Sequence, residues 1–194
     1  MTASLAQIIW IVCVVAWYVL RYPHERKARK TAVAASRRGG REWLLLSIST
    51  TGLGIIPGAY VATGFGGFAD YAFVPLQGYV GTALFIAALA LFYRTHRELG
   101  RNWSVSLDLR KEHKLVTDGV YRYVRHPMYS AFFLWALAQV FLLPNWIAGP
   151  AGLVGFGTLF LFRVFREEEM MHAEFGEAYR VYSRRTKRLI PWVF

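Results

Sequence analysis

The sequence predicts an all-α integral membrane protein with about five transmembrane helices, of which the last two form a tight helical hairpin. Two observations lead to this fold class. The apolar residues make up 55% of the chain and lie in long runs without charge, and the basic residues gather in three separate segments. A helix needs about 20 apolar residues to cross a bilayer. The uncharged runs cover 2–20, 43–69, 71–93 and 127–162, and the length of 194 residues suits one domain.

The first three runs each predict one membrane-spanning helix. Run 2–20 follows no basic residue and precedes no small-x-small cleavage site, so we interpret it as a retained helix rather than a signal peptide. The second span, about 42–62, contains "GLGIIPG", which predicts a kink or an early end near Pro57. The third span, about 77–95, is expected to continue past the membrane and to stop at Gly100.

The last run, 127–162, is too long for one helix across a bilayer. Its middle, "LLPNWIAGPAG", holds prolines and glycines that break helices, and Asn145 and Trp146 suit a polar boundary. We therefore predict two antiparallel helices, roughly 128–143 and 150–166, joined by a tight turn.

The distribution of basic residues predicts the orientation. Segments 21–41, 94–127 and 163–194 hold eight, eight and seven Lys or Arg, whereas 63–76 and the turn near Asn145 hold none. With five spans the three basic segments share one side, which the positive-inside rule assigns to the cytoplasm. We expect a multi-pass protein with its N-terminus outside and its C-terminus cytosolic. The net charge of +11 then serves orientation and attraction to anionic membrane lipids rather than nucleic acid.

The polar segments are expected to be less regular. Segment 21–41 is interpreted as a cytosolic connection along the headgroups, and 102–124 as an irregular stretch with a short hairpin. The tail after 166 is typical of a broken amphipathic helix, with aromatic residues on one face at Phe175, Tyr179 and Tyr182.

We expect one domain, 1–194, in two parts. Residues 1–95 supply three N-terminal transmembrane helices, and residues 96–194 form a catalytic region that includes the hairpin 128–166 and the amphipathic tail. The lone cysteine, Cys13, lies in the first span; it permits no intramolecular disulfide and no Cys-based metal site, and we expect no metal.

A cation and an imidazole stand at the edge of the fourth span. In "DGVYRYVRHPMYS", Arg125 and His126 precede Pro127, and Tyr129 follows near the helix start. Pro127 restricts His126 to extended backbone and suits the first turn of the next helix. By themselves these residues are also typical of snorkelling and interfacial anchoring.

A second polar cluster ends the return helix of the hairpin. In "RVFREEEMMHAEFG", Arg163 and Glu167 share a helix face, as do Glu168 and His172. Because the tight turn makes the two helices neighbours, this cluster should lie against the corner at 125–129. The resulting pocket, half in the membrane and half in the cytosol, suits a polar cofactor on its wet side and a lipidic substrate entering from the bilayer. A helix end covered with solvated charge is the simpler alternative.

The C-terminal half resembles the isoprenylcysteine carboxyl methyltransferase family, as a prokaryotic-type member of the wider superfamily of membrane lipid methyltransferases. The matching stretches are "LGRNWS" (99–104), "HKLVTDGVYRYVRHPMY" (113–129), "FRVFREEEMM" (162–171) and "FGEAYRVYSRRTKRLIP" (175–191). The first 90 residues match in hydropathy and helix count rather than by motif. One departure is Ser130-Ala131, where the family often has Gly.

The resemblance implies an enzyme that transfers a methyl group from S-adenosyl-L-methionine to the carboxylate of an isoprenylcysteine-like, prenylated lipidic substrate. It implies Arg163 as a substrate-binding arginine, with Glu167 and Glu168 as the other catalytic candidates. The cofactor-binding residues that it implies are His113, Leu115, Val116, Gly119, Tyr121, Arg125, His126, Pro127, Tyr129 and Glu167, or Glu168 in place of Glu167.

The chemistry fits these residues. A sulfonium methyl is already activated, so the enzyme must mainly align the reacting atoms and exclude water. A substrate carboxylate is ionised at pH 7, and we assign no general base. Methylation of a phospholipid amine or a small thiol remains an alternative in the same superfamily, and there Glu167, Glu168 or His126 would have to take a proton. An NADPH-dependent membrane reductase and a non-catalytic lipid-binding protein are the alternatives from other classes.

Overall fold

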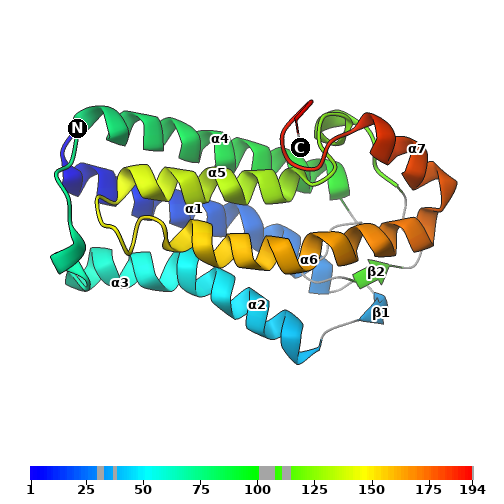
Figure 1. The fold of residues 1–194 in the computed structure, drawn as a ribbon, viewed down its shortest axis with the longest axis horizontal. Coiled ribbons are helices and arrows are strands. Elements are labelled where there is room, and N and C mark those ends of the chain that lie inside the picture. The colour runs from blue at the N-terminus through cyan, green and yellow to red at the C-terminus, as the bar shows by residue number, and fades with distance from the viewer. Residues whose placement is uncertain (30–32, 37–38, 101–107, 111–114, 194) are drawn as a thin grey trace.

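The protein, described by a computed structural model over residues 1–29, 33–36, 39–100, 108–110 and 115–193, is built on long helices lying side by side (Figure 1). Over these residues, five helical rods form the body of the molecule. They are α1 (Ala3–Arg29); the continuous rod α2 (Gly40–Thr50), η1 (Thr51–Ile55) and α3 (Ile56–Thr63); α4 (Pro75–Leu99); α5 (Pro127–Leu142); and α6 (Ala151–Phe175).

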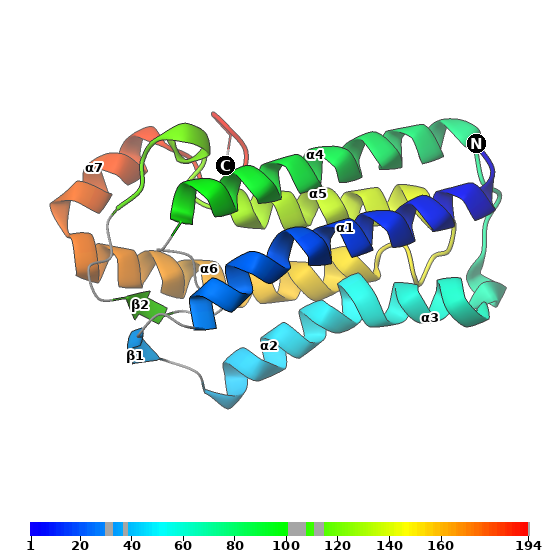
Figure 2. The same cartoon turned by 180° about the vertical axis from the view of Figure 1, so that it is seen from behind.

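The rods follow one another in space as α4, α5, α6 and α2. α4 packs most extensively on α5, α5 packs on α6, and α6 packs on α2 and η1. α1 contacts α4 and α5 and crosses one face of this layer, as the view from behind shows (Figure 2). The predicted membrane-protein fold with helices as its main elements is confirmed, and the predicted hairpin corresponds to α5 and α6.

Helix boundaries follow the prolines and glycines of the sequence. Pro75 and Pro127 occupy the first turns of α4 and α5, where a missing N–H leaves no bond unmade. α3 ends at Gly64, with φ of 71°, and α4 ends at Gly100, with φ of 51°, as predicted for Gly100. These glycines adopt the left-handed region of φ that other residues avoid.

The second rod differs from the prediction near Pro57. We predicted a kink or an early end there, but the helix continues to Thr63 and the irregularity lies one turn earlier, in the π-helical turn η1. Pro57 has no N–H to donate to the preceding turn, and the wider turn, in which the Ile56 N–H donates to the Thr51 carbonyl, accommodates that loss. Gly52 of η1 lies directly against α6, where an added Cβ would collide with the backbone carbonyl of Ala151.

The sixth helix is longer than expected. We predicted an end near 166, whereas α6 continues to Phe175 and stops at Gly176, with φ of 52°. The reason is that the end of a membrane span and the end of a helix have different causes. Charge ends the apolar run after Phe162, but the following Glu, Met and Ala residues are good helix formers, and no breaker occurs before Gly176.

The turn between α5 and α6 contains a third departure from the prediction. Asn145, predicted at a polar boundary, is fully buried, although Trp146 beside it is 71% exposed. The Asn145 Oδ1 accepts hydrogen bonds from the Ile147 and Ala148 N–H groups, and its Nδ2 donates to the Gly66 carbonyl and to Asp70 Oδ1. Asn145 therefore closes the turn and ties it to the connection between α3 and α4.

The polar segments form one small pair of strands. β1 (Val33–Ser36) pairs antiparallel with β2 (Asp108–Arg110), so this strand after α4 pairs with the segment after α1. Much of the rest of 102–124, in which we predicted a hairpin, lies outside the described residues. Pairing between distant segments depends on which helices are neighbours, which the local sequence does not encode. After Gly176 the chain forms α7 (Glu177–Arg185), so the predicted break in the tail is confirmed.

Three helices of the described part are long and apolar enough to cross a membrane. They cover Ala3–Arg26, Gly40–Thr63 and Pro75–Leu99, and Pro127–Leu142 is a shorter apolar helix. The ends of α1 and α4, the start of α2 and all of α7 lie at the same end of the bundle (Figure 1). We call this the α7 end; the described parts of the three basic segments gather there.

The close contact of the second rod with α6 leads to a prediction on stability. Gly52→Ala should lower the free energy of unfolding by about 1–3 kcal/mol, because the new Cβ would overlap the Ala151 backbone and push the rods apart. Gly54→Ala, in the same turn, is the matched control, since its Cβ would meet nothing within 4 Å. Thermal unfolding in detergent checks both variants; equal melting temperatures would contradict this packing.

Candidate active site

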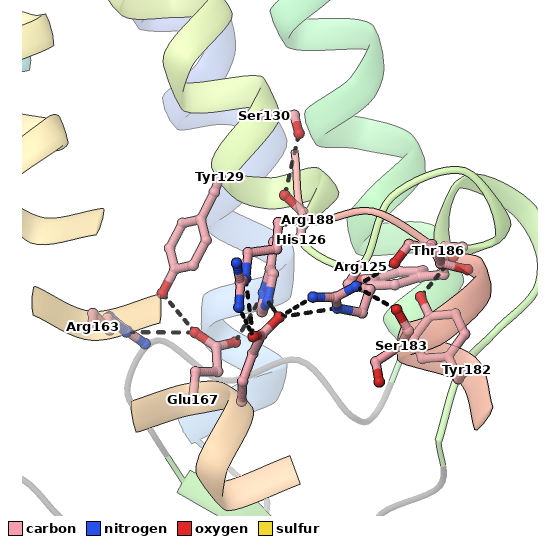
Figure 3. Close-up of polar contacts among 12 residues, drawn as sticks. Arg125, His126, Tyr129, Ser130, Arg163, Glu167, Tyr182, Ser183, Thr186 and Arg188 are labelled. Carbon is pink, nitrogen blue, oxygen red and sulfur yellow. Dashed lines mark hydrogen bonds and ion pairs between the residues drawn. The ribbon is translucent and has the colours of Figure 1, made fainter. Parts of the chain in front are cut away.

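At the α7 end, the start of α5 meets the polar part of α6 and the segment after α7 (Figure 3). The segment after α7 runs beside the residues before α5: the Arg125 N–H donates to the Lys187 carbonyl at 2.7 Å, and the His126 N–H donates to the Arg188 carbonyl at 3.0 Å. The Ser130 hydroxyl donates to the Leu189 carbonyl at 2.7 Å. The C-terminal segment is thereby fixed against the first turn of α5.

The Glu168 carboxylate is the centre of this junction. Arg125 Nε and Nη2 donate to Glu168 Oε1 at 2.9 and 2.6 Å, and Arg188 Nε and Nη2 donate to Oε2 at 3.0 and 2.8 Å. His126 Nε2 lies 3.3 Å from Oε1. Burial alone would raise the pKa of the Glu168 carboxyl, but hydrogen bonds from His126, Arg188 and Arg125 outweigh burial and hold that pKa well below its usual range. Glu168 is therefore ionised whenever this junction is formed.

Arg125 also closes the end of α7. Its Nη1 donates to the carbonyl oxygens of Ser183, at 3.0 Å, and Thr186. These carbonyls belong to the C-terminal turn of a helix, where the backbone dipoles favour a cation. One guanidinium therefore connects α6, α7 and the junction before α5.

Glu167 faces the other side of the same helix turn. Its Oε2 accepts a hydrogen bond of 2.6 Å from the Tyr129 hydroxyl and lies 3.9 Å from Arg163 Nε. Its Oε1 lies 4.0 Å from His126 Nδ1. Glu167 is more accessible than Glu168, with side-chain exposures of 33% and 11%. The two adjacent carboxylates therefore have different surroundings: Glu168 is enclosed by cations, and Glu167 borders the accessible part of the site.

Arg163 lies between α6 and α2. Its Nη1 forms an ion pair of 3.0 Å with Glu42 Oε1, and the side chains are each 11% exposed. Glu42 stands in the first turn of α2, so this contact brings the second rod into the site.

The side of the site toward the core of the bundle is aromatic. The Tyr129 ring stacks on the His126 ring, with centroids 5.4 Å apart, and meets the edges or faces of Phe156 and Phe160 at 5.9 and 5.4 Å. Phe133 packs on the same two phenylalanines. The Tyr129 hydroxyl is thus held between an aromatic wall and the Glu167 carboxylate.

The turn before α5 is fixed by the end of α4. η4 (Gly119–Arg122) begins with Gly119 at φ of 61°, and the Val120 N–H donates to Glu98 Oε2 at 2.7 Å. A Cβ at Gly119 would collide with the Glu98 carboxyl, so the backbone approaches this acid closely. Tyr121 is buried, and burial and the charge of Glu167 raise its pKa well above the usual value, with smaller contributions from Tyr182 and Glu98.

The structure brings together most of the residues predicted for the site. Arg125, His126, Tyr129, Arg163 and both glutamates form one connected series of contacts, as predicted from the hairpin. Leu115 and Val116 lie half-buried in the extended stretch before η4, while His113 lies outside the described residues. Pro127 is buried at the first turn of α5.

Sequence reasoning missed three residues of the site, Glu42, Glu98 and Arg188. Glu42 immediately precedes the uncharged run 43–69, just as Arg163 follows the uncharged run 127–162. If the second and last spans are antiparallel neighbours, opposite charges at these run ends lie at the same depth, and that signal identifies the pair. We find no comparable signal for Glu98 or Arg188, which depend on the folding of the turns.

Comparison with known proteins gives a coherent result. The model of the isoprenylcysteine carboxyl methyltransferase family matches residues 80–173. A protein-S-isoprenylcysteine O-methyltransferase of Schizosaccharomyces pombe is 34% identical over 119 residues, which cover 59% of this chain and 50% of the relative. Protein-S-isoprenylcysteine O-methyltransferase B of Arabidopsis thaliana is 36% identical over 96 residues, which cover 48% of this chain and 49% of the relative.

A longer match occurs in rice. A probable protein-S-isoprenylcysteine O-methyltransferase of Oryza sativa subsp. indica is 32% identical over 131 residues, 64% of each chain. The structure of a eukaryotic intramembrane Ras methyltransferase shares the fold, with a TM-score of 0.57 and 23% identity, over 82% of this chain and 55% of that one. The chain spans about half the length of the S. pombe and A. thaliana relatives.

The surroundings of Glu168 lead to a prediction on pH and stability. Because the folded-state pKa lies below the unfolded value of about 4.3, the stabilisation by this carboxylate is complete above that value and is lost as pH falls below it toward the folded-state pKa. Glu168→Gln should lower stability by about 3–5 kcal/mol at neutral pH, since it leaves the Arg125 charge uncompensated, and should flatten the acid side of the stability profile.

Thermal unfolding between pH 3 and 7 measures this effect. Glu169→Gln is the matched control, because Glu169 is adjacent in sequence but exposed. A Glu168 variant with the same profile as wild type would show that the two arginines do not depend on this carboxylate.

Proposed function

We propose that the protein is a membrane methyltransferase of the isoprenylcysteine carboxyl methyltransferase family, whose model matches residues 80–173. Its substrate is the carboxylate of an isoprenylcysteine-like lipid or prenylated peptide, and its methyl donor is S-adenosyl-L-methionine. The observation that carries the proposal is the position of Arg163, Glu167 and Tyr129, which place a cation, an anion and a hydroxyl beside an aromatic wall.

The acceptor fits the cationic side of this arrangement. An arginine binds a carboxylate through parallel hydrogen bonds, and Arg163 comes from the α6 turn that follows the apolar run. The prenyl chain of such an acceptor needs an apolar surface, which the exposed rings of Phe162 and Phe165 supply on the α6 turn of Arg163. The acceptor thus has its charged group at Arg163 and its lipid toward the bilayer.

The donor fits the acidic and aromatic side. Glu98 accepts a hydrogen bond of 2.7 Å from the Val120 N–H, next to Tyr121 in the chain. Burial first, and then the charge of Glu167, raise the pKa of Tyr121, with a smaller contribution from Glu98. Carboxylates and aromatic faces are the groups that favour a sulfonium or ammonium cation. We propose that the donor-binding residues are Leu115, Val116, Gly119, Tyr121, His126, Tyr129 and Glu167. The family resemblance adds His113 to this set. Arg125 and Pro127, also predicted to bind the donor, shape this site by fixing the junction before α5.

The two predicted catalytic glutamates receive different roles. We assign Glu167 to the reacting region, because it contacts Tyr129 and Arg163 and is the more accessible of the two. Glu168 is a positioning residue, since both of its oxygens are occupied by Arg125 and Arg188.

Catalysis by these residues is a matter of alignment. S-adenosyl-L-methionine, when bound at these residues, would supply an activated methyl group, which would pass to an acceptor carboxylate oxygen as the methyl–sulfur bond breaks and S-adenosyl-L-homocysteine leaves. Arg163 orients the acceptor carboxylate, Glu167 balances the positive charge of the site, and the Tyr129 hydroxyl holds Glu167 in place. The aromatic wall excludes water, and no residue needs to remove a proton from an acceptor that is already ionised.

The protein is further proposed to cross the membrane five times, by α1, the α2–α3 rod, α4, α5 and the first half of α6. The N-terminus is outside, and the α7 end, with the donor site, is cytosolic. Support comes from the apolar lengths of the helices and from the gathering of basic residues at the α7 end.

Substituted-cysteine labelling measures this orientation. In a Cys13→Ser background, a cysteine introduced at exposed Phe68 should react with an impermeant maleimide in intact cells, and one at exposed Arg184 should react only after permeabilisation. Labelling in the opposite order would reverse the proposed topology.

Donor binding gives a direct test of the function. S-adenosyl-L-methionine at 100 times its dissociation constant should stabilise the purified protein by about 2.7 kcal/mol, and NADPH should not. Stabilisation by NADPH alone would favour a membrane reductase, and stabilisation by neither would favour a lipid-binding protein.

Methyl transfer to labelled acceptors tests the residues. Arg163→Ala and Glu167→Ala should each abolish ester formation from an S-prenylcysteine in protein that still folds, although Arg163→Ala leaves the Glu42 carboxylate unpaired and should lower the melting temperature. Arg166→Ala is an exposed control on the same helix. Full turnover in both variants would contradict the assignment of Arg163 and Glu167 to the site. Methylation of a phospholipid amine or a thiol by the wild-type protein, in place of the S-prenylcysteine, would change the proposed class of acceptor.

A further inference from the structure

Glu42 is the acidic residue of the second rod, and it contacts the arginine to which we assign the acceptor carboxylate. The rod 40–63 holds two charged residues, Arg41 and Glu42. Arg41 lies over the Phe162 ring, at 5.5 Å, on the outer side of α6. Glu42 instead forms the 3.0 Å ion pair with Arg163 Nη1.

We infer that Glu42 is a positioning residue of the acceptor site, which orients the Arg163 guanidinium toward the acceptor carboxylate. This inference rests on the proposed function. It adds to the site a residue outside 80–173, the stretch that the family model matches.

The geometry favours this role because the guanidinium is held from two sides. Glu42 of α2 contacts Nη1, while Glu167 of α6 lies 3.9 Å from Nε. An arginine side chain has several rotatable bonds, and a parallel pair of hydrogen bonds to a carboxylate requires a defined plane. The 3.0 Å contact at Nη1 is the closer of the two and comes from another helix, so it restricts the orientation of the guanidinium more than the 3.9 Å contact with Glu167 does.

Charge balance favours the same role. The junction contains three guanidinium groups and three carboxylates, at Arg125, Arg163, Arg188, Glu42, Glu167 and Glu168. Without Glu42, one buried positive charge would lack a balancing group and the Arg163 side chain would turn toward Glu167, which is the remaining partner on its own helix.

A role only in joining helices explains Glu42 less well. α2 and η1 already pack tightly on α6, because Gly52 and Gly155 bring the two backbones into contact. A buried ion pair contributes little net stability compared with an apolar contact of similar size. The pair therefore adds orientation to a helix contact that forms without it.

The experiment compares two ligands that differ only in whether they carry a carboxylate or a neutral carboxamide. For wild type and Glu42→Ala we would measure kcat and KM for an S-prenylcysteine acceptor, and the inhibition constant of its carboxamide, which has no carboxylate. The dissociation constant of S-adenosyl-L-methionine and the melting temperature are measured alongside. Glu25→Ala is the matched control, because it also removes an ion pair with an arginine, Arg21 at 3.2 Å, but this pair lies within α1.

We expect Glu42→Ala to lower kcat/KM for the acceptor about 10- to 100-fold, mainly through KM, because a misplacement of about 1 Å has effects of that size. The carboxamide inhibition constant and the donor dissociation constant should stay within about twofold of their wild-type values, because neither ligand places a carboxylate on Arg163. Glu42→Asp, which keeps the charge on a shorter stem, should recover part of the loss.

Three results would overturn the inference. An unchanged KM would show that Arg163 does not need Glu42. Equal weakening of the acid and its carboxamide, or a loss of activity that follows the melting temperature, would make Glu42 a structural residue. If Glu42→Ala does not fold, Glu42→Gln is measured in the same way. Failure of wild type to form any ester would instead overturn the proposed function.

Discussion

The structure of the site depends on the binding of one carboxylate by two arginines. Glu168 lies on α6, Arg125 lies in the junction before α5, and Arg188 lies in the segment after α7. These elements are far apart in the sequence. The junction before α5 and the segment after α7 pair through their main chains at a single bridge, between Val124 and Lys187. Because both carboxylate oxygens are occupied, Glu168 fixes the distance between α6 and the start of α5. The positions of His126 and Tyr129, which face the neighbouring Glu167, follow from that distance.

This arrangement also explains how so many charges are tolerated at the edge of apolar helices. An isolated charge there would carry a large cost of desolvation, and the cost falls when each charge has an opposite partner and hydrogen bonds. Arg125 meets Glu168 and two carbonyl groups, and Arg163 meets Glu42 and Glu167. The pairs are unequal in accessibility, since Glu168 is enclosed and Glu167 is open to one side. An enclosed pair preserves the shape of the site, while an accessible acid next to a tyrosine and an arginine remains available to ligands.

The sequence was sufficient for the parts of the site that depend on a single hairpin. Pro127 and the break around Asn145 predict the α5–α6 hairpin, and the hairpin brings the 125–129 corner to Arg163 and the two glutamates. The sequence was not sufficient for contacts between elements that become neighbours only through the packing of the whole bundle. Glu42 requires that the second rod lie next to α6, Arg188 requires the chain to return after α7, and the pairing of 33–36 with 108–110 requires both. The buried position of Asn145 was missed for a related reason, because its partners, Gly66 and Asp70, belong to another connection.

The part of the chain without motif resemblance is therefore more than a membrane anchor. The family match begins at residue 80, yet the second rod lies against α6 through Gly52 and supplies Glu42 to Arg163. Backbone contact at a glycine leaves little freedom for the rod to slide or rotate, since side chains that could adapt are absent at that point. A carboxylate in the first turn of such a rod is consequently held at a fixed depth and direction. The packing of Gly52 against α6 thus determines the position of the Glu42 carboxylate at the polar end of the rod. This packing connects the first half of the chain to the chemistry proposed for the second half.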